Sequence, residues 1–259
     1  MSIADSTYKA INDARANSGV GILRSAIDSD IKIALSPATT TRAATAAAFS
    51  RDVNVRLQTA AGAVHSWYNG TLAISAADTS SAGTISIKDS ATEVTLVNGE
   101  GSVTLNGNAA AWLAGTKQVE TIAVTGGCST AGNLTVAVTA AGMTGSPKSV
   151  TVAVTTDDNT TDEVAAKVRA ALAADATVGA YFTVGGSNSD IVLTKKAKAA
   201  NDATLAIAFT VGSTGVTVGS STNTTAGVAP ETNTLTVAKN SSEPLLSNVA
   251  SATSVETIV

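Results

Sequence analysis

Short runs in which apolar and polar residues alternate make up most of the chain after residue 50. Alternation with a period of two places one set of side chains on each face of a β-strand. The Asn69-Gly70 pair is typical of a tight hairpin turn. The sequence therefore predicts short strands at residues 53–57, 64–68, 71–76, 84–87, 93–97, 102–105, 120–125, 134–138, 149–154, 181–184, 191–194, 204–209 and 234–238.

One stretch, residues 159–174, has the period of an amphipathic helix instead. Thr160 and Glu163 have the spacing of a capping box, in which each satisfies a free backbone N–H at the start of a helix. One apolar stripe runs along the helix and is made of Val164, Val168, Ala171 and Leu172. We expect this stripe to lie across one face of a sheet formed by the neighbouring strands.

These elements predict a mainly β protein with an α+β part. Residues 1–50 hold too few apolar side chains to fold alone, although residues 5–15 suit a short helix and Ile31 and Ile33 alternate as in a strand. The expected segments are an N-terminal arm and linker at 1–50, a β-sandwich at 51–125, an α+β domain with one helix on a sheet at 126–212, and a C-terminal strand and tail at 213–259.

The composition leaves the predicted fold unchanged but indicates the character of the core and of the surface. Aromatic residues make up 3% of the chain and charged residues 14%, well below the usual quarter or so. The cores must therefore be aliphatic, and the surface must be largely neutral and rich in hydroxyl groups. Neighbouring copies can cover such a surface with little ionic desolvation.

Charge and cysteine content exclude several classes of partner. The net charge is −4 with no basic run, so no nucleic-acid footprint is present. No apolar run approaches the ~18 residues of a membrane span, and Met1–Ser6 does not resemble a secretory signal. The single cysteine cannot form an intrachain disulfide, so we expect synthesis in a reducing cytoplasm.

The candidate catalytic residues lack partners in the sequence. His65 is the one histidine, and we expect it to pack in a strand at or near the surface. Cys128 follows two glycines at the expected seam between the domains, and no nearby Lys, Arg or His would lower its pKa. We therefore expect neither to be catalytic.

The candidate binding residues also have simpler interpretations. The acidic cluster at 157–163 does not match a calcium loop, and a helix cap explains it. Lys195, Lys196 and Lys198 suit a solvated strand end. Trp67, Tyr68 and Trp112 would suit a carbohydrate platform or, more commonly in a β-sandwich, a core.

Two stretches carry a family resemblance. Residues 77–87 and 94–105 resemble the bacterial Ig-like modules of intimin-type adhesins and bacteriophage virion proteins. Residues 121–211, with the capped Ala-rich helix and Phe182-Thr-Val-Gly-Gly, are similar to a module of tailed-phage structural proteins. The resemblance implies an Ig-like sandwich at 51–125 and a repeated assembly subunit without catalytic residues.

We therefore expect a non-enzymatic structural component of a tailed-phage virion, with no catalytic, cofactor-binding or metal-binding residues. Within that class the resemblance favours a capsid decoration or head-surface protein that is attached through its two terminal arms. The expected partners are other copies of the chain and other virion proteins, foremost the major capsid protein. We expect no binding to nucleic acid or to a membrane. The expected location is the virion, after synthesis in the cytoplasm of the bacterial host.

Three alternatives remain open. A tail-tube or other tail structural protein would form rings through its sheet edges. A surface adhesin-type module would bind carbohydrate weakly through aromatic rings. A β-rich glycosidase would need a pair of carboxylates in a groove.

Overall fold

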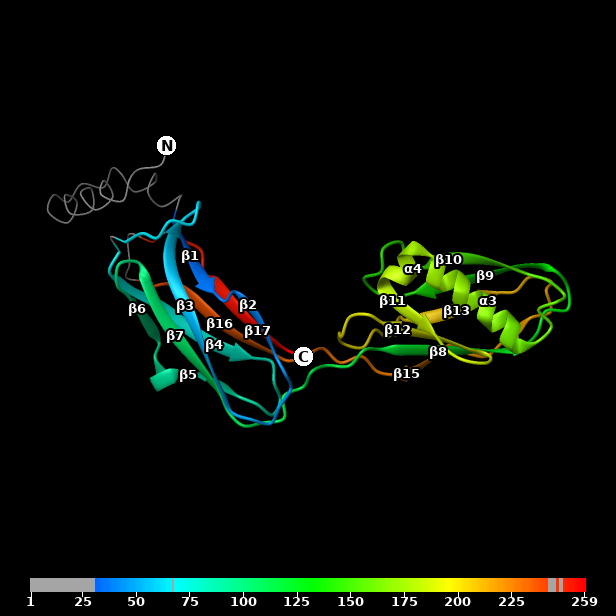
Figure 1. Ribbon diagram of the computed structural model, residues 1–259, viewed down its shortest axis with the longest axis horizontal. Coiled ribbons are helices and arrows are strands. Elements are labelled where there is room, and N and C mark those ends of the chain that lie inside the picture. Colours follow the sequence, from blue (N-terminus) through cyan, green and yellow to red (C-terminus); the bar gives the residue numbers. More distant parts are fainter. Residues whose placement is uncertain (1–30, 67, 242–245, 247–248) are drawn as a thin grey trace. The chain divides into compact units, whose positions relative to one another are not determined.

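The computed structural model describes residues 31–66, 68–241, 246 and 249–259. The chain divides into two compact units (Figure 1). The first unit contains the residues up to Ala114 together with Glu231–Val259, and the second is Gly115–Pro230. The second unit is therefore an insertion into the first. The protein is mainly β with a small helical part, which confirms the predicted fold class.

The first unit is a sandwich of two sheets, with strand orders β1-β3-β7-β5 and β2-β17-β16-β4-β6. All pairings are antiparallel except that of β2 with β17. The short 3-10 turn η1, Lys88–Ser90, joins β5 to β6. The strands are β1 Ile31–Ser36, β2 Thr39–Arg42, β3 Phe49–Thr59, β4 Gly70–Asp78, β5 Ile85–Ile87, β6 Glu93–Leu96, β7 Glu100–Gly107, β16 Thr232–Lys239 and β17 Ala252–Ile258.

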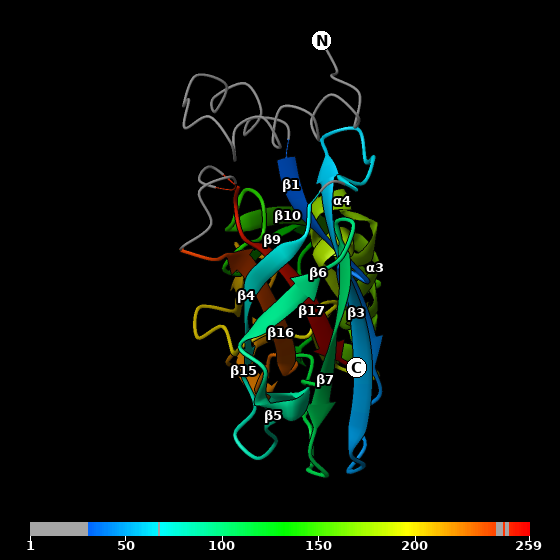
Figure 2. The same cartoon turned by 90° about the vertical axis from the view of Figure 1, so that its left-hand side faces the viewer.

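The two sheets lie face to face (Figure 2) and share one aliphatic core. Side chains at alternate positions of β3, β7, β4 and β16 point inward and are buried, as the two-residue period predicts. Fully buried members include Val53, Val55, Leu57, Leu72, Leu96, Leu105, Leu235 and Val237. Burial of such side chains is worth about 1.5–3 kcal/mol each and is the main stabilising term.

The second unit combines two sheets with two helices. One sheet has the order β10-β9-β13, and in the other β11-β12-β8 continues into β14 and β15, which both pair with β8. The bounds are β8 Val119–Gly126, β9 Gly132–Thr139, β10 Lys148–Val154, α3 Thr161–Ala174, α4 Ala176–Tyr181, β11 Phe182–Gly185, β12 Asp190–Lys195, β13 Ala206–Thr210, β14 Thr217–Val218 and β15 Thr222–Thr225.

Helix α3 forms where the sequence predicts it, and it closes the core of the second unit. Thr160 and Glu163 make both hydrogen bonds of the capping box. Val164, Val168 and Leu172 are fully buried among side chains of both sheets. The helix contacts β10 and β8, so that one apolar stripe seals the space between the two sheets.

The predicted segment boundaries are wrong in three places. Residues 31–50 are not an arm, because β1, β2 and the start of β3 belong to the sandwich. Strand β8, assigned to the sandwich, belongs to the second unit. The predicted C-terminal tail supplies β14 and β15 to the second unit and β16 and β17 to the first. The cause is long-range pairing, since β16 pairs with β4 from the first third of the chain.

Smaller predictions also differ from the structure. Val64 makes an isolated bridge with Gln58 where a strand was predicted, and Asn69-Gly70 leads into β4 instead of turning a hairpin. The tight turn is at Asn98-Gly99, where both residues have positive φ and a Cβ on Gly99 would lie 2.5 Å from the His65 carbonyl oxygen. A second helix, α4, was not predicted. The predicted helix at 5–15 lies outside the described residues.

Val168→Asp is expected to unfold the second unit, because it places an unpaired charge where the side chain has no exposed surface. The loss should exceed about 3 kcal/mol, measured by urea denaturation. Ala170→Asp, on the exposed side of the same helix, is the control and should cost under about 1 kcal/mol. Equal stability of the two variants would contradict the assignment of the buried face.

Removal of residues 1–48 is expected to abolish the cooperative unfolding of the first unit. The deletion strips β1 and β2, and with them the buried side chains of Ile31, Ile33 and Leu35. Removal of residues 1–30 is the control, because it keeps every described strand. Calorimetry would contradict the sandwich assignment if both truncated proteins melted like the full chain.

Candidate assembly interface

The two single-residue candidates, His65 and Cys128, are both buried. His65 has no exposed surface, rather than the partly exposed position that the sequence suggests. Cys128 lies in the core of the second unit and not at a seam, and its thiol donates to the Thr130 carbonyl oxygen at 3.1 Å. Neither side chain is open to a substrate.

The acidic cluster at the start of α3 is used inside the fold. Asp158 accepts hydrogen bonds from the Thr155 backbone N–H at 2.7 Å and from Lys167 Nζ at 2.6 Å. Burial raises the pKa of Asp158, but the hydrogen bonds from Lys167 and Thr155 outweigh it, and the pKa lies below its ordinary value. No group of three or more His, Cys, Asp or Glu side chains suited to a metal ion occurs among the described residues.

The prediction of a solvated strand end at 195–198 is wrong for Lys195. This residue is 6% exposed and forms an ion pair with Asp202 at 3.3 Å. Asp202 also accepts from the Ala141 backbone N–H and from the N–H and hydroxyl of Thr204. Burial raises the pKa of Asp202, but these hydrogen bonds lower it to about 2. The cluster fastens the loop after β12 to the end of β9, and it uses Lys195 inside the fold while Lys196 stays exposed.

The two described candidate rings, those of Tyr68 and Trp112, do not form a carbohydrate platform. Tyr68 is 2% exposed and Trp112 is 3% exposed, so neither ring can stack on a sugar. The Trp112 ring packs edge-on against Phe49, with 5.9 Å between centroids, and the Arg42 guanidinium lies 4.0 Å from the Phe49 centroid. Trp67 lies outside the described residues.

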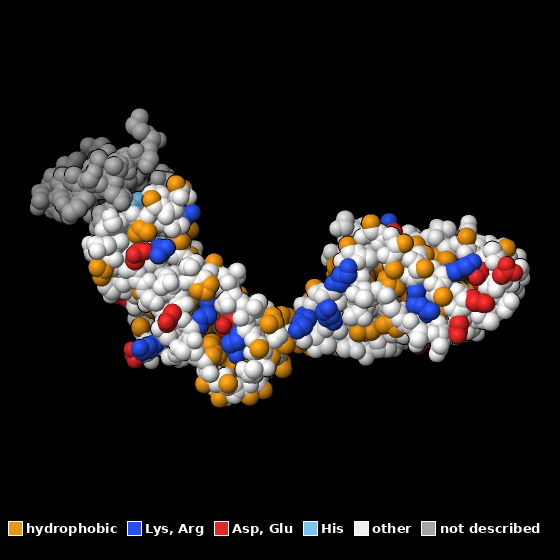
Figure 3. Space-filling model, in the orientation of Figure 1, with side chains coloured by type: hydrophobic (Ala, Val, Ile, Leu, Met, Phe, Trp, Pro, Cys, Tyr) orange, Lys and Arg blue, Asp and Glu red, His pale blue; other side chains and the backbone are white. Residues whose placement is uncertain are grey.

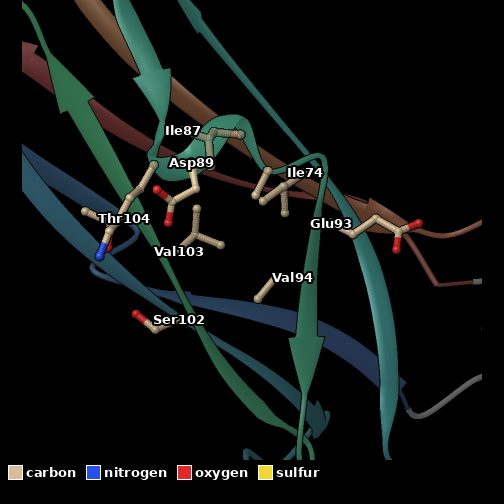
Figure 4. A pocket seen from close by; sticks show the side chains of 10 residues that line it. Ile74, Ile87, Asp89, Glu93, Val94, Ser102, Val103 and Thr104 are labelled. Carbon is tan, nitrogen blue, oxygen red and sulfur yellow. The ribbon is translucent and has the colours of Figure 1, made fainter.

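A cleft of about 270 Å³ opens between the sheets where β5, η1 and β6 face β7 (Figure 4). Its walls include the aliphatic side chains of Ile74, Val94 and Val103, and the Asp89 carboxylate points into it. Every polar residue that lines the cleft is exposed or half-buried. A binding site usually holds a few convergent buried polar groups. This cleft does not have them.

The most distinctive surface is the outer face of the sheet β2-β17-β16-β4-β6. Along each strand, buried side chains alternate with outward ones, and the outward ones are almost all small and uncharged. We call this surface the threonine face. Its members are Thr39, Thr41, Thr71, Ala73, Ser75, Ala77, Glu93, Thr95, Thr232, Thr234, Thr236, Ala238, Thr253, Val255 and Thr257.

The strand register arranges these side chains in rows across the sheet. Thr41, Thr257 and Thr232 are direct neighbours on β2, β17 and β16. In the next rows Thr234 lies between Val255 and Ala77, and Thr236 lies between Thr253 and Ser75. The result is a grid of hydroxyl and methyl groups with one carboxylate, Glu93, on the edge strand β6.

The outer face of the other sheet has a different character. It carries the charged residues Lys32, Asp52, Arg56 and Glu100, together with amide and hydroxyl side chains. Arg56 and Glu100 form an ion pair at 2.8 Å with both side chains about half exposed. Figure 3 shows how sparse charged side chains are on the visible surface as a whole. Within the sandwich, the charges are concentrated on one face and nearly absent from the other.

A buried ionic group lies directly beneath the threonine face. Glu256 of β17 is 4% exposed and lies 3.2 Å from Arg42 Nε of β2 and 3.7 Å from Arg51 Nε of β3. Asn233 of β16 donates to the same carboxylate at 2.9 Å. Burial lowers the pKa of Arg51, and the charge of Glu256 opposes this only in part. The carboxylate thus joins three strands of one sheet and one strand of the other.

Neither the threonine face nor this ionic group was predicted from the sequence. Alternating threonines at 232–236 and the run at 39–41 were visible signals of a hydroxyl-bearing face. The sequence did not show that these threonines share one sheet, because the strands that carry them are far apart in the chain. Arg42 of β2 and Glu256 of β17, for example, are 214 residues apart.

Comparisons with protein-family models, with curated proteins and with solved structures found no match. No helix among the described residues is long and apolar enough to cross a membrane.

Glu256→Gln is expected to destabilise the first unit by about 3–5 kcal/mol, because it leaves two largely buried guanidinium groups without a counter-charge. The matched control is Glu100→Gln, which removes an exposed ion pair and should cost under about 1 kcal/mol. Urea denaturation measures both. Similar losses for the two variants would show that the buried carboxylate has no special role.

Proposed function

We propose that the protein is a non-enzymatic structural component of a tailed-phage virion, and specifically a capsid decoration protein. A neighbouring protein surface would cover its threonine face in the particle, with the major capsid protein as the shell to which it attaches. The observation that carries the proposal is this face, with one outward charge among fifteen described side chains. The cores of protein interfaces are depleted of charge in the same way.

The energetics of this face favour association. Covering a hydroxyl and methyl surface removes little ionic hydration, whereas covering the opposite face would desolvate Lys32, Asp52, Arg56 and Glu100. The buried ionic group and the ladders of five strands hold the face rigid. A preformed surface loses little conformational freedom when it binds, so more of the contact energy appears as affinity.

The attachment element differs from the one that the sequence suggests. Residues 31–50 and the described residues of 231–259 are strands and loops of the sandwich and not free arms. The proposal therefore places attachment on the face that those strands form. The virion assignment itself rests on the resemblance of residues 77–87, 94–105 and 121–211 to phage structural modules.

The test is co-sedimentation of the purified protein with capsid shells of the phage that encodes it, prepared without this protein. Thr234→Arg places a long cation at the centre of the face, and we expect it to weaken binding at least tenfold. Asn54→Arg, an outward position on the opposite sheet, is the control and should bind like the wild type.

Two results would overturn the proposal. One is the absence of wild-type binding to shells. The other is assembly of the purified protein alone into rings or tubes in negative-stain micrographs, which would identify a tail component. Equal binding by both arginine variants would move attachment away from the threonine face.

A further inference from the structure

We infer that residues 219–226 form a strap that opens while the rest of the second unit stays folded. Its opening uncovers the outer edge of β8 and the carboxylate of Glu120, which lies beneath the strap. The threonine face is in the other unit, so the proposed function is not involved. Three features carry the inference: the shallow packing of the strap, its single polar anchor, and the buried carboxylate under that anchor.

The strap is held to the second unit by very little apolar contact. All of its residues are exposed except Ser221, which is half-buried. The chain just before the strap is different, because Val216 is 2% exposed and belongs to the core. Segments with few buried apolar contacts are the ones that open locally in folded proteins.

The strap covers the edge of β8 through short and irregular pairing. Its strand β15 pairs antiparallel with the start of β8, and the register shifts between Asn223 and Thr225. Strand β14, which precedes the strap, pairs with the end of β8 and also has a register shift. On the other side of β8, the pairing with β12 has no such shift. The extra residue of a bulge disrupts the ladder locally, so the strap is the less firmly held neighbour of β8.

One serine anchors the strap. The Ser221 hydroxyl donates to Glu120 Oε1 at 2.5 Å and accepts the Ile207 backbone N–H at 2.9 Å. These two hydrogen bonds tie the strap to β8 and to β13 at once. The remaining side-chain hydrogen bonds of the strap lie at the exposed surface, such as that from Asn223 to Asn201 at 2.8 Å.

Glu120 is the group that the strap covers. It is 2% exposed and lies on the core side of β8, like Ile122. Its Oε2 has no hydrogen-bond partner in the described part of the chain. Lys195, the buried cation of the same unit, is paired with Asp202 instead. A buried carboxylate oxygen without a partner is unfavourable, and water can reach it when the strap opens. Opening therefore relieves this burial.

Opening also changes what the second unit offers to other proteins. An uncovered strand edge is a template on which an extended segment of another chain can pair. While the strap is closed, β15 occupies this edge of β8. The strap therefore controls access to the edge of β8.

Hydrogen–deuterium exchange of the full chain, followed by mass spectrometry of its peptides, tests the inference. Peptides that cover 219–226 should exchange at least about 100-fold faster than those of β12 and α3, because the strap opens without them. Ser221→Ala removes the anchor and should speed exchange of the strap about tenfold or more, with β12 and α3 unchanged. Ser220→Ala, at the adjacent exposed position, is the control and should exchange like the wild type.

A second variant tests the part played by the carboxylate. Glu120→Gln keeps an oxygen for the Ser221 hydroxyl but removes the buried charge, so exchange of the strap should become slower. Unchanged or faster exchange in this variant would show that the carboxylate does not favour opening.

Two further results would overturn the inference. One is exchange of the strap as slow as that of α3 in the wild type, which would mean that the strap opens only when the whole unit unfolds. This comparison does not depend on whether a variant folds. The other is an equal acceleration of the strap, β12 and α3 by Ser221→Ala, which would show a loss of global stability instead of a local anchor.

Discussion

The first unit depends on a carboxylate that is buried among strands from opposite ends of the chain. Glu256 near the C-terminus accepts charge-assisted contacts from Arg42 and Arg51 and a hydrogen bond from Asn233. Because a buried charge is tolerated only with partners in place, this group selects one register for β2, β17 and β16. The parallel pairing of β2 with β17 has no short turn to define it, and the ionic group supplies that definition.

This constraint accounts for the organisation of the whole chain. The sandwich is complete only when β16 and β17 have returned to pair with β4 and β2. The second unit is therefore carried as an insertion between Ala114 and Glu231, and it has a separate core around α3. The same register that buries Leu235 and Val237 turns the threonines of β16 outward. Interior and exterior of the sheet are set by one pattern.

Local pattern was enough to predict much of the fold. The alternation at 132–139 and 148–154 and the capped stripe of α3 are determined by nearby residues, and all three elements were predicted closely. Strand partners are determined by residues that are distant in the chain, and the predictions that depended on strand pairing were wrong. Strand β8 was assigned to the wrong unit, and residues 31–50 were predicted to be an arm. Ile31, Ile33 and Leu35 are buried only when β3 and β16 are in place, and local pattern does not show this. The threonine face was unpredictable for the same reason.

The central claim is that the threonine face is covered when the protein is assembled on the particle. The most direct measurement is the rate of maleimide labelling of Thr234→Cys and Asn54→Cys, in the free protein at low concentration and on assembled particles. The native Cys128 is buried and should not be labelled. The account predicts that both cysteines react in the free protein and that assembly protects the one at 234 alone. Equal labelling of both positions on the particle would contradict it.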